Sequence, residues 1–387
     1  MVKGRQMFKT TGGLRQPGAF IPQLESFRGW AILLVVAFHV HGILLGEGPL
    51  SAASSIWLRL VGAGNTGVTL FFVLSGFLLT RPFIRALHEG ARISIGHFYL
   101  ARILRIVPLY YAVVLVAWLV SGNSTDAFKA LMFIPVGFSI FPFSVPWWSL
   151  CTEMQFYLLL PWLMLALHQR KGRWLILLGL SIWLSLHWLH LLEPGWLALP
   201  TGSQSSLFGR GFAFLVGGLA AWFHMSSTYA RLVASPLRVT LIALALLAAL
   251  IALLQWYGLV GQRSATMAMP LYHDLEALLW AGVLLCGLGP MAAGGRLFIN
   301  PLFSHFGSIS YSLYLVHLPV QFYLLHPLKV AGLNTSDIRM ITAIIASFML
   351  SWFLAVLCHH AIEKPCLLLK SQLPTLSGRP RADHARA

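Results

Sequence analysis

Runs of apolar residues long enough to cross a bilayer recur along the whole chain. A membrane helix needs about 20 predominantly apolar residues. The segments with that pattern are 29–46, 63–84, 104–121, 148–168, 173–192, 208–224, 237–257, 270–289, 307–328 and 338–361. The 58% share of hydrophobic residues is above, and the 10% share of charged residues is below, what is typical of a soluble protein. We therefore predict an all-α membrane protein with about ten transmembrane helices.

The Lys and Arg residues predict how these spans are oriented. Such residues collect in the cytoplasmic loops of membrane proteins. With a cytoplasmic N-terminus, six of the 27 fall in outside segments, namely Arg59, Lys129, Arg210, Arg263, Lys329 and Arg339. We expect both termini in the cytoplasm and the chain in a plasma or inner membrane. The net charge of +16 then reflects topology and attraction to anionic lipid, and no nucleic-acid partner is expected.

The chain divides into a short basic cytoplasmic segment (1–22), a membrane domain (23–366) and a short tail (367–387) that we expect to be disordered. The start lacks the pattern of a cleaved signal peptide, so the first apolar run is expected to remain as an anchor. The two halves lack the matching Gly/Pro-broken helices of transporter repeats. The four cysteines lack metal-binding spacing, and no metal site is expected.

The stretch 24–42, which leads into the first span, places two ionisable residues on one helix face. Arg28 and His39 are eleven residues apart, which is close to three helical turns and about 16 Å along the axis. Ionisable groups inside a bilayer are rare and usually functional. A histidine that only hydrogen-bonds a neighbouring helix is the alternative. His41 points to nearly the opposite side of the helix, so the two histidines do not form a metal pair.

The second and third spans contain a mid-span serine and a pair of arginines. Ser75 and Gly76 indicate close helix approach, and a serine nucleophile would also need a neighbouring base. Arg102 and Arg105 share a helix face at the cytoplasmic end of the third span, level with Arg28. They either anchor the helix end or bind phosphate, which guanidinium groups recognise bidentately.

Polar groups also lie within two later spans. Glu153 lies about two turns inside the outer end of the fourth span, where a carboxylate needs a partner or water. It bonds a neighbouring helix, orients His39 or contacts a polar substrate. Ser310, Tyr314 and His317 follow at i, i+4 and i+7, a polar stripe that either packs helices or lines a channel.

Together these motifs resemble the acyltransferase 3 family of integral-membrane O-acyltransferases, the O-antigen and exopolysaccharide O-acetylase type. The resemblance covers residues 22–366. It rests on Arg28-x10-His39, FFVLSGF (71–77), Arg102-x-x-Arg105, WSLCTEMQFYLLLP (148–161), SYSLYLVH (310–317) and Glu363-Lys364-Pro365. The Asp-Gly pair that often precedes the family arginine is Glu25-Ser26 here. We expect the stand-alone form, without the extra spans and outer esterase-like domain of some members.

The resemblance implies transfer of an acyl group, commonly acetyl, from cytoplasmic acyl-CoA to a hydroxyl of a carbohydrate or lipid-linked glycan. Acyl-CoA is a substrate, and no permanently bound cofactor is expected. His39 would be the catalytic base, and Glu153 would fix its tautomer or raise its basicity. Arg28, Arg102 and Arg105 would hold the CoA phosphates, since a pantetheine arm is of the order of the Arg28–His39 rise. Weaker candidates for substrate binding are Ser75, Tyr314, His317, Asp274 and Glu276.

Two other functions stay open from sequence. A proton-coupled transporter would use His39, Glu153 and His317 as a relay. An inactive family member would bind a lipid-linked glycan without transfer. The acceptor (polysaccharide, lipid-linked sugar, macrolide or another small molecule) and the acyl group (acetyl, succinyl or longer) are also open, and the outer loops 122–147 and 193–207 are expected to select them.

Overall fold

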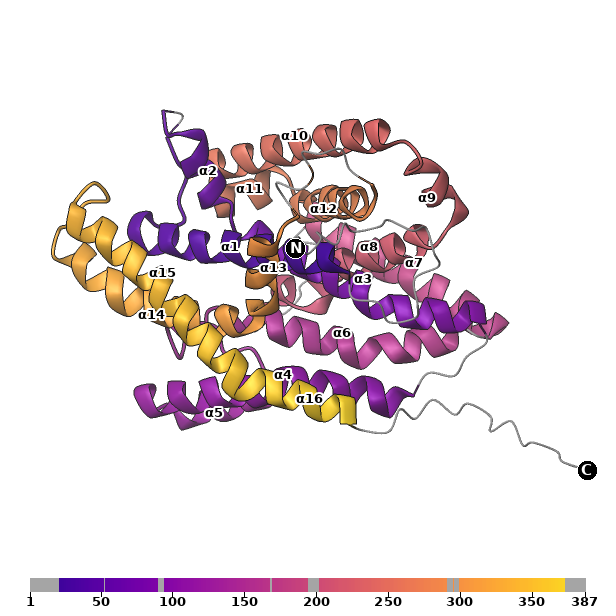
Figure 1. Cartoon of the computed structure of the whole chain (residues 1–387), viewed down its shortest axis with the longest axis horizontal. Coiled ribbons are helices and arrows are strands. Elements are labelled where there is room, and N and C mark those ends of the chain that lie inside the picture. The colour runs from indigo at the N-terminus through magenta and orange to yellow at the C-terminus, as the bar shows by residue number, and fades with distance from the viewer. Residues whose placement is uncertain are drawn as a thin grey trace, which may run out of the picture.

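The computed structural model describes residues 21–51, 53–89, 94–167, 169–193, 202–290, 295 and 299–372. Within these ranges every regular element is a helix, as the sequence predicts (Figure 1). Most of the expected basic segment 1–22, the part of loop 193–207 from 194 to 201, and most of the expected tail 367–387 lie outside the described residues.

The longer helices are α1 (Pro22–Leu45), α3 (Thr66–Glu89), α4 (Ile95–Ser121), α6 (Trp147–Ala166), α7 (Arg170–Leu192), α8 (Leu207–His224), α10 (Pro236–Val260), α12 (Tyr272–Leu288), α14 (Ser310–Val330) and α15 (Ile338–Cys358). The shorter ones are α2 (Ile56–Gly62), α5 (Ser124–Leu131), η1 (Ser203–Ser205), α9 (Ser227–Leu232), α11 (Gln262–Ala268), α13 (Pro301–Ser308), the π-helix η3 (His359–Glu363) and α16 (Lys364–Gln372). Each predicted span coincides with one of the longer helices.

Seven of the described helical segments are long and apolar enough to cross a membrane, which makes the chain a multi-pass membrane protein. They are α1, α3, α4, α7, α10, the segment 203–224 and the segment 338–369. The three other predicted spans coincide with α6, α12 and α14. These three are not among the seven. Helix α12 has only 17 residues, and α6 and α14 contain polar residues such as Glu153 and His317 as well as internal prolines.

Helices α1 and α3 cross closely at the centre of the molecule because glycine removes the side chain at the contact. A Cβ on Gly67 of α3 would collide with the carbonyl oxygen of Ala31 on α1. Gly76 plays the same part against Phe214 of α8, so the small residue beside Ser75 serves helix packing. These crossings hold α3 between its neighbours and fix the direction in which Ser75 points.

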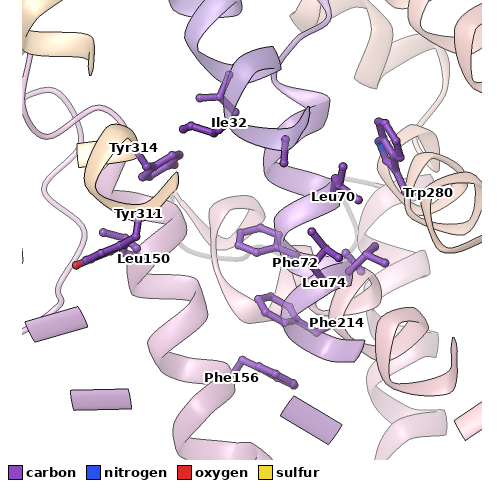
Figure 2. Close-up of a cluster of buried hydrophobic side chains, with 14 of the residues drawn as sticks. Ile32, Leu70, Phe72, Leu74, Leu150, Phe156, Phe214, Trp280, Tyr311 and Tyr314 are labelled. Atoms are coloured by element: carbon purple, nitrogen blue, oxygen red, sulfur yellow. The ribbon is translucent and has the colours of Figure 1, made fainter. Parts of the chain in front are cut away.

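The buried core joins these helices (Figure 2). Phe214 of α8 stacks between Phe72 of α3 and Phe156 of α6, with ring centroids 4.6 and 4.4 Å apart. Figure 2 shows Tyr314 of α14 on one side of this core and Trp280 of α12 on the other. Polar groups on α14 and polar groups on α12 therefore face different sides of α3.

Candidate functional site

A cavity of about 100 Å³ lies between α1, α3, α4, α6 and α14. Its polar lining consists of Arg28, Ser75, Arg102, Arg105, Ser149, Glu153, Tyr157, Ser310, Tyr311 and Tyr314. Six of the candidates expected from sequence thus share one cavity, although they come from five helices. Ser310 belongs to the predicted polar stripe, and Ser149, Tyr157 and Tyr311 are additional. Tyr157 follows Glu153 by one helical turn, which is the sequence signal that both face the same side.

Arg28 is held at the edge of this cavity by contacts on both sides. Its Nη2 donates a 2.9 Å hydrogen bond to Ser310 Oγ on α14, and its Nη1 lies 3.4 Å from both carboxylate oxygens of Glu25. The Arg28 side chain is only 12% exposed. A buried guanidinium needs such partners, because an uncompensated charge there is costly.

Arg102 is held by aromatic rings. Its guanidinium carbon lies 6.0 Å from the ring centroid of Phe98 and 5.9 Å from that of Tyr157. Its Nε has no hydrogen-bond partner among the described residues. Because Arg102 lines the cavity, its guanidinium is available there to an anionic ligand.

A buried carboxylate that reasoning from sequence did not select as a site residue lies near enough to the arginines to attract them electrostatically. Glu363, in the π-helix η3, is 3% exposed and accepts hydrogen bonds from Ser312 Oγ at 2.9 Å and from His359 Nδ1 at 3.0 Å. It interacts electrostatically with Arg105 and with Arg28. Its place in the Glu-Lys-Pro motif was the available signal in the sequence. The sequence does not reveal, however, that the end of the last predicted span lies near the arginines.

One carboxylate oxygen of Glu153 accepts a hydrogen bond inside the cavity. Ser75 Oγ donates a 2.5 Å hydrogen bond to Glu153 Oε1, which joins α3 to α6. Glu153 also interacts electrostatically with Arg102 and Arg28. The structure thus pairs the mid-span serine with a carboxylate and places both beside the arginines.

His39 contacts a second histidine, His317 of α14. The distance from His317 Nε2 to His39 Nδ1 is 3.0 Å. His39 Nδ1 also lies 3.0 Å from Val35 O, and His317 Nδ1 lies 2.9 Å from Leu313 O. The expected contact between Glu153 and His39 is therefore corrected. Glu153 bonds Ser75 because α6 turns it into the cavity, whereas His39 lies beyond the cavity lining.

Tyr314 separates the cavity from the histidine pair. It lines the cavity, and its ring centroid is 6.0 Å from that of His317. Its hydroxyl makes a 2.6 Å hydrogen bond with Ser149 Oγ and donates to Pro146 O at 2.9 Å. The stripe of Ser310, Tyr314 and His317 thus lines the cavity at its first two positions and packs against α1 at its third.

Asp274 and Glu276 lie apart from this cavity. Asp274 is 7% exposed and faces His187 Nε2 at 3.1 Å and Trp188 Nε1 at 3.0 Å. Glu276 is 1% exposed and accepts from Thr69 Oγ1 at 2.6 Å, with His273 Nδ1 at 3.1 Å. Both are buried groups with protein partners. No group of three or more His, Cys, Asp or Glu in the described part of the chain is arranged to hold a metal ion.

The fold and the site define a multi-pass helical membrane protein with an arginine-lined cavity that leads toward a pair of histidines. Residues 21–360 match the family described as the acyltransferase domain. Because this match covers most of the chain, the protein belongs to that acyltransferase family. The match also spans every residue assigned to the site except Glu363.

Three relatives share about a quarter of their aligned residues with the chain. YrhL of Bacillus subtilis, named as a peptidoglycan O-acetyltransferase, is 26% identical over 89% of this chain and 55% of its own length. The peptidoglycan O-acetyltransferase OatA of Listeria monocytogenes is 26% identical over 46% of the chain and 30% of its own. The O-acetyltransferase OatA of Staphylococcus aureus (strain NCTC 8325) is 26% identical over 40% and 26%. The chain therefore spans about half or less of these relatives. No solved structure matches it significantly.

Proposed function

We propose that the protein is a membrane O-acetyltransferase that moves an acetyl group from cytoplasmic acyl-CoA to a carbohydrate hydroxyl at the membrane or its outer face. The observation that carries this proposal is the order of groups along α1 and α14. Arginines line one end of a cavity, and a histidine pair lies beyond its other end. Membership of the acyltransferase family supports acyl transfer as the reaction, and the relatives' names support a glycan such as peptidoglycan as the acceptor.

The arginines are the proposed donor site. Arg28, Arg102 and Arg105 bind the phosphates of acyl-CoA, since planar guanidinium groups match phosphate oxygens. The rise of about 16 Å from Arg28 to His39 suits a pantetheine arm that carries the thioester toward the imidazole. In this arrangement α6, α12 and α14 complete ten spans, both termini are cytoplasmic and the arginines lie on the cytoplasmic side of a plasma or inner membrane.

His39 is the proposed base, since an imidazole near neutrality takes a proton from a hydroxyl. As the acceptor oxygen attacks the thioester carbonyl, a C–O bond forms and the C–S bond breaks. The hydroxyl proton passes to His39 and then from His39 to the departing thiolate of CoA, so that free CoA and the O-acetyl ester result and His39 returns to its neutral form. The Tyr314–Ser149 contact must open for the thioester to pass.

Glu153 has a different proposed part from the one expected. With its hydrogen bond from Ser75 and its electrostatic attraction to Arg28 and Arg102, it sets the arrangement of the donor cavity. A relay of His39, Glu153 and His317 for proton-coupled transport is less favoured, because the hydrogen bond of Glu153 goes to Ser75 and not to either histidine.

The test is acetyl transfer from labelled acetyl-CoA by the purified full-length protein in lipid nanodiscs, with lipid-linked glycans and cell-wall fragments as acceptors. We expect wild-type protein to label at least one glycan and His39→Ala to abolish labelling while the protein keeps its thermal transition. Near-normal transfer by His39→Ala would remove His39 as the base. Absence of transfer to every glycan, together with proton-coupled uptake of a solute, would favour the transporter.

A further inference from the structure

We infer that His317 is the positioning residue for His39: it holds His39 in the tautomer that carries its proton on Nδ1, so that Nε2 is the base. This inference rests on the proposed role of His39. It replaces the expected carboxylate with a neutral imidazole, and it names the nitrogen that receives the acceptor proton.

The tautomers follow from the two hydrogen bonds of His317. Its Nδ1 lies 2.9 Å from Leu313 O, and a carbonyl oxygen only accepts, so Nδ1 carries the hydrogen. In a neutral imidazole the other nitrogen is then an acceptor. That nitrogen, Nε2, lies 3.0 Å from His39 Nδ1. His39 Nδ1 must therefore be the donor.

The surroundings of His39 lead to the same assignment. Val35 O, one turn earlier on α1, also lies 3.0 Å from His39 Nδ1. Both neighbours of His39 Nδ1 are acceptors, so they share the hydrogen that this nitrogen carries. In the alternative tautomer, with the hydrogen on Nε2, the unprotonated Nδ1 would face two acceptor lone pairs, which is unfavourable. Among the described residues, His39 Nε2 has no hydrogen-bond partner, so its lone pair is free to take a proton.

Packing holds this pair in place. His317 is 0% exposed, as is Gln321 one turn further along α14. Gln321 Nε2 donates a 3.1 Å hydrogen bond to Val36 O and so ties α14 to α1 beside the pair. The two imidazoles therefore meet at a fixed helix contact, which limits rotation of His39.

A neutral partner suits this depth in the membrane. A carboxylate behind His39 would be a second buried charge, and burying charge inside a bilayer is costly. His317 accepts the Nδ1 hydrogen without a charge of its own. When His39 is protonated, the same contact becomes a charge-assisted hydrogen bond, which is shorter and stronger than a neutral one.

Two substitutions separate the contact with His39 from the contact with α14. Gln at 317 reaches as far as Nε2 and offers an amide oxygen to His39 Nδ1. Asn at 317 reaches only as far as Nδ1, so it bonds its own helix and leaves His39 without a partner. We expect His317→Asn to lower kcat about 100-fold with little change in the KM for acetyl-CoA, and His317→Gln to restore at least about a tenth of the wild-type kcat.

The tautomer is read directly by ¹⁵N NMR of the histidine-labelled protein in nanodiscs, with His39→Ala used to assign the signals. In the wild type we expect His39 to be protonated on Nδ1 and unprotonated on Nε2, and His317→Asn to admit the other tautomer. A wild-type His39 protonated on Nε2 would overturn the inference even if the variants fail to fold. Equal kcat values for His317→Asn and wild type would also overturn it, whereas an active His39→Ala would remove His39 as the base, and absence of acetyl transfer by the wild-type protein would overturn the proposed function itself.

Discussion

The guanidinium of Arg28 on α1 donates a 2.9 Å hydrogen bond to the hydroxyl of Ser310 on α14. The same two helices meet again at His39 and His317, further from the arginines. The two contacts fix the position of Arg28 along the helix axis relative to the histidine pair. For an acyl-CoA bound at Arg28, the distance to the proposed base His39 would therefore be set by the contact between the two helices and not by side-chain mobility.

We expect Ser310→Ala to weaken this arrangement without abolishing it. The hydroxyl is one partner of a charged donor, and such a bond contributes about 2 kcal/mol. Loss of the bond lets Arg28 swing toward Glu25, so the KM for acetyl-CoA should rise roughly tenfold while kcat changes less. Steady-state kinetics in nanodiscs measure both. Ser308→Ala, an exposed serine at the end of α13, is the matched control and should leave both constants unchanged.

Arg102→Ala is expected to weaken acetyl-CoA binding by about 100-fold, because a phosphate contact with a charged group is lost. Calorimetric titration of the purified protein with acetyl-CoA measures the affinity. Arg102→Lys should recover only part of it, since an ammonium does not reproduce the guanidinium fork. Arg170→Ala, an exposed arginine at the start of α7, tests whether any loss of positive charge has the same effect. An unchanged affinity in Arg102→Ala would contradict the donor site.

Glu153→Gln distinguishes a role in the donor cavity from a role at the base. The amide oxygen of Gln still accepts the hydrogen bond from Ser75, but the charge near Arg28 and Arg102 is gone. We expect kcat to stay within about tenfold of wild type and the KM for acetyl-CoA to change. If kcat instead falls as far as it does in His39→Ala, Glu153 acts on the reacting groups and the role proposed here is wrong.

The sequence predicts the helices well because each is marked by its own residues. Every expected span coincides with a long helix, and the helical period places Arg28 and His39 on one face. Short helices such as α5 and α13 were not predicted, because segments of eight residues lack a long apolar run. Thus the local part of the fold follows from apolar length and period.

The partners of the site residues could not be predicted in the same way. Glu153 and His317 were both polar groups inside spans, and depth alone did not decide which one reaches His39. That choice depends on how α14 and α6 rotate about their axes, which is set by contacts between residues far apart in sequence. Ser310 and His317 share the helix face that meets α1. The polar stripe therefore marked the contact face of α14, but it did not show that α1 is the helix it contacts.

Asp274→Ala tests whether the acids of α12 bind an acceptor or support the fold. Asp274 is buried against His187 and Trp188, and Trp280 of the same helix lies across α3 from Tyr314 (Figure 2). Removing a buried charged partner typically costs about 3 kcal/mol, so we expect a lower thermal unfolding temperature by intrinsic fluorescence. The KM for the glycan should stay within about twofold, since the group does not line the cavity.

Two further variants make this prediction specific. Asp274→Asn should be milder than Asp274→Ala, because its amide oxygen still accepts from Trp188. Glu193→Ala removes an exposed carboxylate at the end of α7 and should not lower the unfolding temperature, since a negative charge at a helix C-terminus is unfavourable. If Asp274→Ala instead keeps the wild-type unfolding temperature and raises the KM for the glycan tenfold or more, the carboxylate contacts the acceptor and its pairing with α7 is secondary.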